Sequence, residues 1–261
     1  MRYYVLRAAL LAAALCVVPV AVAALLLGLA CAAVVSALLI ALGWIIYFHA
    51  ERAVLTALSA RQVSEVERPE LYRLVRELAR SARLPMPRLF VSPAEQPNIL
   101  TVGWGPRSAA VCCTDGLLQL LSAAELRAVI AHELSHVSRR DVAVSSWSAG
   151  LVSLVAAFPL AALLMQAAAP AGREYDADIG GALLTGEPLA LASALRKIDA
   201  GAADLPLRRR GPLAAASHLM IACPFPPGTL GGSGGLLRTH PPTGERIRRL
   251  EGLAGLPASG S

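Results

Sequence analysis

Two histidines enclose a glutamate at a spacing suited to metal chemistry in the stretch "VIAHELSHVSRRD", residues 129–141. On a helix, positions i and i+4 project from the same face about 5–6 Å apart. His132 and His136 can therefore each offer a ring nitrogen to one zinc ion, which binds imidazole nitrogens at about 2.0–2.1 Å. Glu133, beside the first ligand, can accept a proton from a water that zinc has acidified and pass it to a leaving amine. The pattern predicts zinc-dependent hydrolysis of a peptide bond.

A simpler interpretation is an amphipathic helix that happens to carry two exposed histidines. The chain contains only five histidines, so two of them around a glutamate at this spacing are not expected by chance. The helix that carries this motif also has Leu126, Val129 and Ile130 at helical spacing, which predicts a buried stripe on it. We therefore favour the zinc site over the simpler interpretation.

A zinc ion held by two histidines needs a third protein ligand. The candidates all lie downstream of the motif, and they are Glu174, Asp176, Asp178, His218 and His240. Glu174 and Asp178 are four residues apart in "REYDAD", residues 173–178, so they share one helix face. One of them can bind the metal while the other accepts a hydrogen bond from a ligand histidine. A solvated helix start, where acids favour the helix dipole, explains this cluster equally well.

The remaining histidines have less specific surroundings. His240 directly precedes Pro241 and Pro242, which stiffen its backbone. It either reaches the cleft and donates to the oxyanion of the reaction, or packs at the start of the last helix, and we favour the first role. His218 and His49 are expected to be structural or interfacial.

The N-terminal part of the chain is apolar over a length that predicts membrane insertion. No Asp, Glu, Lys or Arg occurs from Ala8 to Ala50. As a helix this run would measure roughly 60 Å, about twice the thickness of a hydrocarbon core. We expect two spans, about residues 8–27 and 30–49, with a turn near Gly28. A secretory signal peptide is the alternative, but its apolar region is only about 7–15 residues long.

Charge predicts the orientation of this hairpin. Two spans place the N-terminal Arg2 and Arg7 on the same side as the arginine-rich segment 51–141, and the positive-inside rule makes that side the cytoplasm. The expected location is the cell (inner) membrane, multi-pass, with the catalytic domain cytoplasmic. The net charge of +6 fits an anionic lipid surface. Nucleic acid is not an expected partner, because no stacking aromatics accompany the arginines.

The rest of the chain predicts an α+β fold that is mainly helical and contains a small β-sheet. Strands are expected at 88–92, 98–105 and 108–114, and helices at 51–84, 173–184, 188–200 and 241–250. Ser122 followed by Glu125 is a capping-box pattern that starts the motif helix. The domains expected are a transmembrane hairpin at 1–50, a metallopeptidase domain at 51–253 and a disordered tail at 254–261.

Three motifs together resemble the HtpX-type family of membrane zinc endopeptidases, which is related to the CAAX prenyl proteases and a mitochondrial inner-membrane quality-control protease. They are "RAVIAHELSHVSRRD", "REYDAD" and "THPPTGERIRRL", and they lie in the family's order behind an N-terminal hairpin. The resemblance covers residues 1–250. It implies a zincin-type domain with one Zn²⁺ per chain, and polypeptide substrates, especially damaged membrane proteins.

The resemblance also implies roles for individual residues. His132, His136 and Glu174 would be the zinc ligands, Glu133 the general base, and Asp178 the hydrogen-bond partner of a ligand histidine. It further implies that residues Asn98, Ile99, Leu100 and Thr101 form an edge strand beside the cleft. A substrate backbone can pair with such an edge by strand addition.

The chain departs from the family pattern between its second histidine and its third ligand. HtpX-type proteins typically have two further spans there, whereas this chain has one apolar run, residues 142–171. A single crossing would put Glu174 across a bilayer about 30 Å thick from His136. Two full spans need about 40 residues. We therefore expect an apolar helical hairpin that turns near Pro159 and returns to the same side, within the leaflet or against the domain.

The predicted function is that of a membrane-anchored zinc metalloendopeptidase in membrane protein quality control. An intramembrane zinc protease also carries this motif, but there the motif lies inside an apolar span. The charges of Arg127, Arg139 and Asp141 would be costly at that depth. A zinc-stabilised membrane scaffold without turnover is the alternative from a different class, and its mark would be the lack of a base at position 133.

Overall fold

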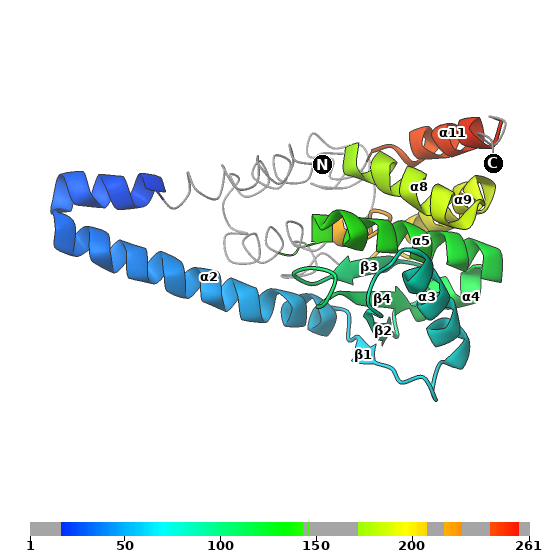
Figure 1. Ribbon diagram of the computed structural model, residues 1–261, viewed down its shortest axis with the longest axis horizontal. Coiled ribbons are helices and arrows are strands. Elements are labelled where there is room, and N and C mark those ends of the chain that lie inside the picture. The colour runs from blue at the N-terminus through cyan, green and yellow to red at the C-terminus, as the bar shows by residue number, and fades with distance from the viewer. Residues whose placement is uncertain (1–16, 143–145, 147–171, 208–216, 226–240, 256–261) are drawn as a thin grey trace.

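The computed structural model describes residues 17–142, 146, 172–207, 217–225 and 241–255. In chain order the elements are helix Val17–Leu27, α2 (Leu29–Ala57), β1 (Arg61–Gln62), α3 (Pro69–Ser81), β2 (Arg88–Ser92), β3 (Ile99–Val102), β4 (Ala110–Thr114), α4 (Asp115–Leu120), α5 (Ala123–Arg139), α8 (Gly172–Thr185), α9 (Pro188–Asp204), the 3-10 turn η1 (Ser217–Leu219) and α11 (Thr243–Ala254). The prediction of a mainly helical α+β fold with a small sheet is confirmed (Figure 1).

Within the described residues, the sheet has four strands in the order β1-β2-β4-β3. Strands β2 and β4 are parallel, while β1 and β3 run antiparallel to their neighbours. The three strands expected from the sequence are therefore present, and β3 lies at an edge. The short strand β1 was not predicted, because two exposed polar residues carry no strand periodicity.

The helices that carry the motif and the acidic cluster pack directly on one another. In Figure 1, α5 lies between the sheet and the helices α8, α9 and α11. Small residues allow α8 to approach α5 closely. A Cβ added at Gly181 would lie 2.8 Å from the backbone nitrogen of His132, and one at Gly180 would lie 2.1 Å from the hydroxyl of Ser135. This close approach places the acidic cluster against the motif.

The start of α5 confirms the predicted capping box. The Ser122 hydroxyl accepts from the Glu125 backbone nitrogen, and the Glu125 carboxylate accepts from the Ser122 nitrogen at 2.9 Å. The same carboxylate accepts hydrogen bonds from Ser193 at 2.7 Å and from Lys197 at 2.8 Å, both on α9. Although burial opposes it, these hydrogen bonds lower the pKa of Glu125 to about 2. Glu125 thus fixes both the helix start and its contact with α9.

Replacing Glu125 by alanine is expected to lower the free energy of unfolding by about 1–2 kcal/mol near neutral pH. A depressed pKa contributes stability that is complete above the unfolded-state value near 4.5 and is lost as pH falls towards about 2. The difference in free energy of unfolding between wild type and the Glu125 variant should therefore become smaller as the pH falls from about 4.5 to about 2. Thermal melts in detergent at several pH values measure it, with exposed Glu70→Ala as the control. A constant difference down to the lowest pH would contradict this role.

The N-terminal helices form a reversed pair that meets at Gly28. Gly28 has φ 88°, a left-handed conformation that glycine adopts without strain, and the chain folds back there (Figure 1). Among the described helices, none is by itself long and apolar enough to cross a bilayer. The two parts of α2, Leu29–Ile45 and Phe48–Ala57, meet at an angle of 43° and reach that length and composition together.

The second apolar helix extends beyond the expected span. That span was expected at about residues 30–49, and α2 continues to Ala57 because its last turns enter the domain. There Val54, Leu55 and Leu58 pack against Leu100 and Met220. The expected helix over 51–84 is consequently two helices, α2 and α3, with β1 between them. The predicted hairpin 142–171 and tail 254–261 lie almost wholly outside the residues that the structure describes.

Candidate metal centre

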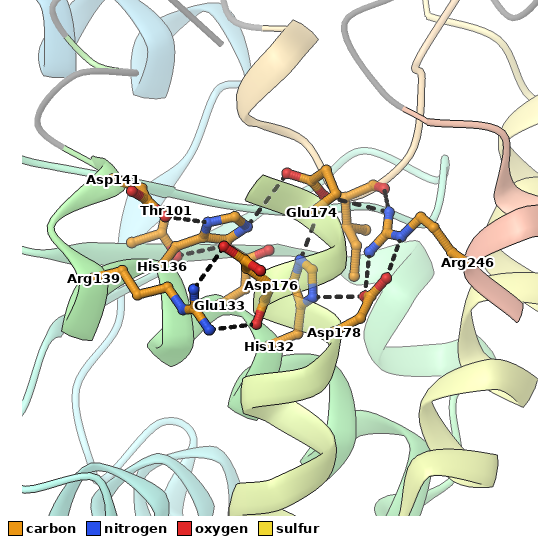
Figure 2. A network of polar contacts seen from close by, with 11 residues as sticks. Thr101, His132, Glu133, His136, Arg139, Asp141, Glu174, Asp176, Asp178 and Arg246 are labelled. Carbon is orange, nitrogen blue, oxygen red and sulfur yellow. Dashed lines mark hydrogen bonds and ion pairs between the residues drawn. The ribbon is translucent and has the colours of Figure 1, made fainter. Parts of the chain in front are cut away.

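Three predicted ligands converge between α5 and α8. His132 and His136 project from α5, and Glu174 comes from the first turn of α8 (Figure 2). Their candidate ligand atoms all lie within 4.8 Å of one another. The Nε2 atom of His132 is 3.6 Å from Glu174 Oε2, and that of His136 is 3.4 Å from Glu174 Oε1. The structure therefore brings together two imidazoles and one carboxylate from helices far apart in the sequence.

The donor set fits a metal ion such as zinc. Two ligands bound tetrahedrally at about 2.0–2.1 Å lie roughly 3.3 Å apart, close to the distances seen here. His132 is fully buried, and within the described part of the chain its Nε2 atom has no hydrogen-bond partner. A buried polar atom without a partner costs about 1–3 kcal/mol, which a bound ion would offset. Two imidazoles and a carboxylate are ligands that zinc accepts.

The charges around the histidines favour a cation. Burial alone would lower the pKa of His136, but Glu174 and Asp141 outweigh it and raise that pKa to about 10. Burial would likewise raise the pKa of Glu174, yet the neighbouring histidines and Arg246 hold it well below its ordinary value. The pocket therefore carries an ionised carboxylate directed at two imidazoles.

Asp178 lies behind His132, at the place that the family resemblance implied for it. Its Oδ1 atom is 3.0 Å from Nδ1 of His132. Burial acts against ionisation of Asp178, but Arg246 outweighs it and keeps the pKa of Asp178 below its ordinary value. An ionised Asp178 favours the tautomer with the proton on Nδ1, which leaves the Nε2 lone pair of His132 for a metal.

Arg246 completes this arrangement and was not predicted from the sequence. It is only 2% exposed and donates two hydrogen bonds to Asp178, from Nε at 2.8 Å and from Nη2 at 2.7 Å. It also donates to the Ile221 carbonyl at 2.9 Å and lies 3.4 Å from Glu174. The available signal was its position four residues before Leu250, which places both on one buried face of α11.

Arg246→Met is expected to weaken zinc binding by roughly 10–100-fold, as loss of a partner behind a ligand typically does. It should also lower stability by about 3–5 kcal/mol, because a buried carboxylate loses its counter-charge. Chelator competition and thermal melts measure the two effects. The matched control is Arg248→Met, an exposed arginine on the same helix. Unchanged zinc affinity in the Arg246 variant would refute its role in the site.

Glu133 is buried beside the three ligands and is held by the sheet. Its Oε2 atom accepts a hydrogen bond of 2.6 Å from the Thr101 hydroxyl on β3. Burial raises the pKa of Glu133 above its ordinary value, although His132 and His136 act against the shift. A carboxylate with a raised pKa is suited to general base catalysis near neutral pH. The geometry thus allows the role predicted for Glu133.

The expected substrate strand, Asn98 to Thr101, is buried at the edge of the sheet. Its outer side is already paired with another part of the chain. The backbone nitrogen of Ile221 donates to the Ile99 carbonyl at 3.1 Å, and Leu100 forms a bridge with Met220. A substrate that adds to β3 at these residues has to displace that segment. Substrate binding by Asn98, Ile99, Leu100 and Thr101 stays a prediction.

A small pocket opens on the site, and one unexpected histidine lines it. Its volume is about 20 Å³, which holds about one water molecule. The lining residues are Thr101, Glu133, His136, Val142, Arg173, Glu174, His218 and Leu219. His218 was expected to be structural or interfacial, yet it faces the predicted catalytic groups. His240, the expected oxyanion donor, lies outside the described residues.

Comparisons with known proteins agree with this arrangement. The family description "Peptidase family M48" matches residues 65–254, most of the chain. A "Protease HtpX homolog" of Kineococcus radiotolerans is 46% identical over 242 residues, covering 80% of this chain and 81% of the relative. Proteins of the same description from an Arthrobacter species and from Ralstonia nicotianae are 43% and 41% identical, and each comparison covers more than four fifths of both chains. The chain belongs to peptidase family M48, among the HtpX-type proteases.

Proposed function

We propose that this protein is a zinc-dependent endopeptidase, anchored in the cell membrane with its catalytic domain on the cytoplasmic side, that removes damaged membrane proteins. The observation that carries the proposal is the convergence of His132, His136 and Glu174 beside a buried Glu133. Family membership supports a protease, and the donor set supports a metal-dependent one.

Each residue of the site has a separate proposed role. His132, His136 and Glu174 would hold the zinc ion, which when bound supplies a Lewis acid for water and for the peptide carbonyl. Glu133 removes a proton from the attacking water and delivers it to the leaving amine. Thr101 keeps the Glu133 carboxylate aimed at the pocket through its 2.6 Å hydrogen bond. Asp178 and Arg246 fix the orientation of His132.

The segment that pairs with β3 constrains how a substrate strand binds. The described residues leave room for about one water molecule beside Glu133. Because Ile221 and Met220 pair with β3, a substrate strand that adds to β3 at Ile99 or Leu100 has to displace that segment.

Membrane attachment is supported by composition and by exposure. The segment 8–50 contains no Asp, Glu, Lys or Arg, and the first part of α2 exposes large apolar residues, including Leu29, Leu38, Trp44 and Phe48. Exposed apolar side chains on this scale are typical of surfaces that contact lipid. A cytoplasmic domain on such an anchor would meet the cytosolic loops of neighbouring membrane proteins.

An intramembrane protease fits the catalytic helix less well. Both ends of α5 carry charged contacts, with Glu125 bound by Lys197 at the start and Arg139 paired with Asp176 near the end. Charges at the depth of the hydrocarbon core cost several kcal/mol each. These contacts favour a catalytic helix outside the bilayer.

The proposed activity can be tested with the full-length protein purified in detergent. Casein should be cleaved, the metal chelator 1,10-phenanthroline should abolish cleavage, and added zinc should restore it while magnesium should not. Zinc binding without cleavage of casein or of a membrane protein with cytosolic loops would instead identify a zinc-stabilised scaffold. Cleavage that persists after complete removal of metal would refute the proposed chemistry.

A further inference from the structure

One end of the catalytic domain faces the direction in which the apolar helices project. In Figure 1, α2 and the helix Val17–Leu27 extend beyond the domain to the left. The connection between β3 and β4, residues 103–109, lies at this same end, as does the C-terminal end of α5. If the apolar helices lie in a bilayer, this end of the domain is the part that meets the membrane surface.

Polar contacts fix the position of the β3–β4 connection relative to α2. Arg88 at the start of β2 makes two hydrogen bonds to Glu51 of α2, at 2.7 and 3.0 Å. The same guanidinium donates to the Ser108 carbonyl at 2.7 Å. The β3–β4 connection is thereby tied to α2 at residue 51. Ala50 is the last residue of the stretch without charged side chains, so the connection lies where that stretch ends.

Apolar packing brings two further segments to the same place. Ala109, Val137 and Val142 form a buried cluster, and Leu84 packs against it. Val137 and Val142 flank the end of α5, and Leu84 belongs to the segment between α3 and β2. The end of α5 and the α3–β2 segment therefore lie next to the β3–β4 connection.

Each of these segments carries an exposed arginine. They are Arg52 on α2, Arg83 after α3, Arg107 before β4 and Arg140 at the end of α5. The neighbouring acids do not balance this charge, because Glu51 is engaged by Arg88 and Asp141 is buried, 3.6 Å from His136. The end of the domain nearest the apolar helices is therefore strongly positive.

Aromatic side chains lie near this end of the domain as well. Trp104 is half-buried in the β3–β4 connection, where its backbone nitrogen donates to the Ser108 hydroxyl at 2.9 Å. On α2, exposed Trp44 and Phe48 stack with ring centroids 5.3 Å apart, one to two turns before Glu51. Tryptophan is enriched where hydrocarbon meets headgroups, and arginine binds phosphate oxygens in a bidentate manner.

We propose that Arg52, Arg83, Trp104, Arg107 and Arg140, here called the arginine rim, bind the anionic phospholipid headgroups of the membrane surface. The rim rests on the proposed insertion of the N-terminal helices and goes beyond it, because it gives the catalytic domain a second attachment to the bilayer.

The attachment determines where cleavage occurs. His136 is one helical turn before Arg140, about 6 Å along α5. If the arginine rim binds headgroups, the catalytic pocket lies only about one to two helical turns from the membrane surface. Substrate segments that leave the bilayer would be cut close to the point where they emerge.

The rim can be tested by its contact with lipid, without using catalysis as the readout. The full-length protein, with Trp44 and Trp147 replaced by phenylalanine so that Trp104 is the single tryptophan, is placed in nanodiscs that contain brominated phospholipids. Phosphatidylglycerol should increase the quenching of Trp104 over that in phosphatidylcholine alone. About 1 M salt should remove the increase, because it shortens the screening length to about 3 Å.

Matched variants distinguish binding by the arginine rim from an effect of the overall net charge. The triple variant Arg52→Gln, Arg107→Gln and Arg140→Gln should lose the lipid-dependent quenching, with an apparent affinity roughly fivefold lower for each arginine removed. The control Arg80→Gln, Arg196→Gln and Arg248→Gln removes equal charge from exposed positions on α3, α9 and α11, and should retain it. Equal quenching in both lipids, or in both triple variants, would overturn the proposal.

Failure of the rim and failure of the proposed activity give different results. Casein cleavage in detergent involves no bilayer, so the rim variant should cleave casein as fast as wild type. Full casein cleavage without lipid-dependent quenching would refute the arginine rim and support the proposed peptidase activity. Lipid-dependent quenching without any cleavage would refute the peptidase activity and support the arginine rim.

Discussion

Replacing Glu133 by glutamine is expected to reduce peptide cleavage by roughly three orders of magnitude, within the range that a general base contributes. Glutamine has nearly the same shape and can still accept the hydrogen bond from Thr101, but it does not take a proton from water. The proposed metal ligands His132, His136 and Glu174 are untouched, so zinc content should not change. Initial rates of casein cleavage and zinc per chain, measured on the same preparations, check both parts.

The control for this experiment is Glu77→Gln. Glu77 is an exposed residue of α3 that pairs with Arg127 of α5, so the change removes a carboxylate that contacts the same helix without entering the site. It should leave both cleavage and zinc content at wild-type values. Equal activity in wild type and the Glu133 variant would show that the carboxylate beside the ligands is not the base.

Replacing Glu174 by glutamine should weaken zinc binding by at least about two orders of magnitude and abolish cleavage with it. The change removes the only predicted anionic ligand, and zinc binding depends on deprotonated ligands. It also leaves Arg246, 3.4 Å away, without one of its two carboxylate neighbours. Competition with a fluorescent zinc chelator gives the dissociation constant directly.

Asp176→Asn is the matched control on the same helix. Asp176 is 44% exposed and pairs with Arg139 rather than with a predicted ligand, so zinc affinity should be unchanged. If the Glu174 variant bound zinc as tightly as wild type, the third ligand would have to be another residue, and the convergence of α5 and α8 would need a different explanation.

The parts of the site that the sequence predicted are those set by helix geometry. The i, i+4 spacing relates His132 to His136 within α5, and relates Glu174 to Asp178 within α8, before any tertiary contact is known. Their types then limit the metal and the chemistry. The assignment of Glu174 as third ligand needed the family resemblance, because spacing alone left Asp178 equally possible.

The parts that were missed depend on contacts between distant segments. Arg246 meets Asp178 across 68 residues, and Thr101 meets Glu133 across 32. No local periodicity reports such pairs. His218 enters the pocket only because the segment that follows it pairs with the edge of β3. Its neighbourhood in the sequence contains no sign of that pairing.

The end of the second apolar helix depends on such contacts too. The second span was expected at about residues 30–49, and α2, which contains these residues, continues to Ala57, since Val54, Leu55 and Leu58 are buried in the domain. Burial on the domain side sustains the helix after the apolar stretch ends. The hydrogen bond between Arg88 and Glu51 lies where α2 changes from exposed apolar residues to residues that pack on the domain.

Zinc K-edge X-ray absorption of the purified full-length protein tests the central claim most directly, because it reports the metal and its ligands together. We predict one zinc per chain, bound by two imidazole nitrogens and carboxylate oxygen at about 2.0–2.2 Å, without sulfur. The Glu174→Gln variant should lose this spectrum. A spectrum dominated by sulfur at about 2.3 Å, or a protein that binds no zinc at all, would contradict a metal centre built from His132, His136 and Glu174.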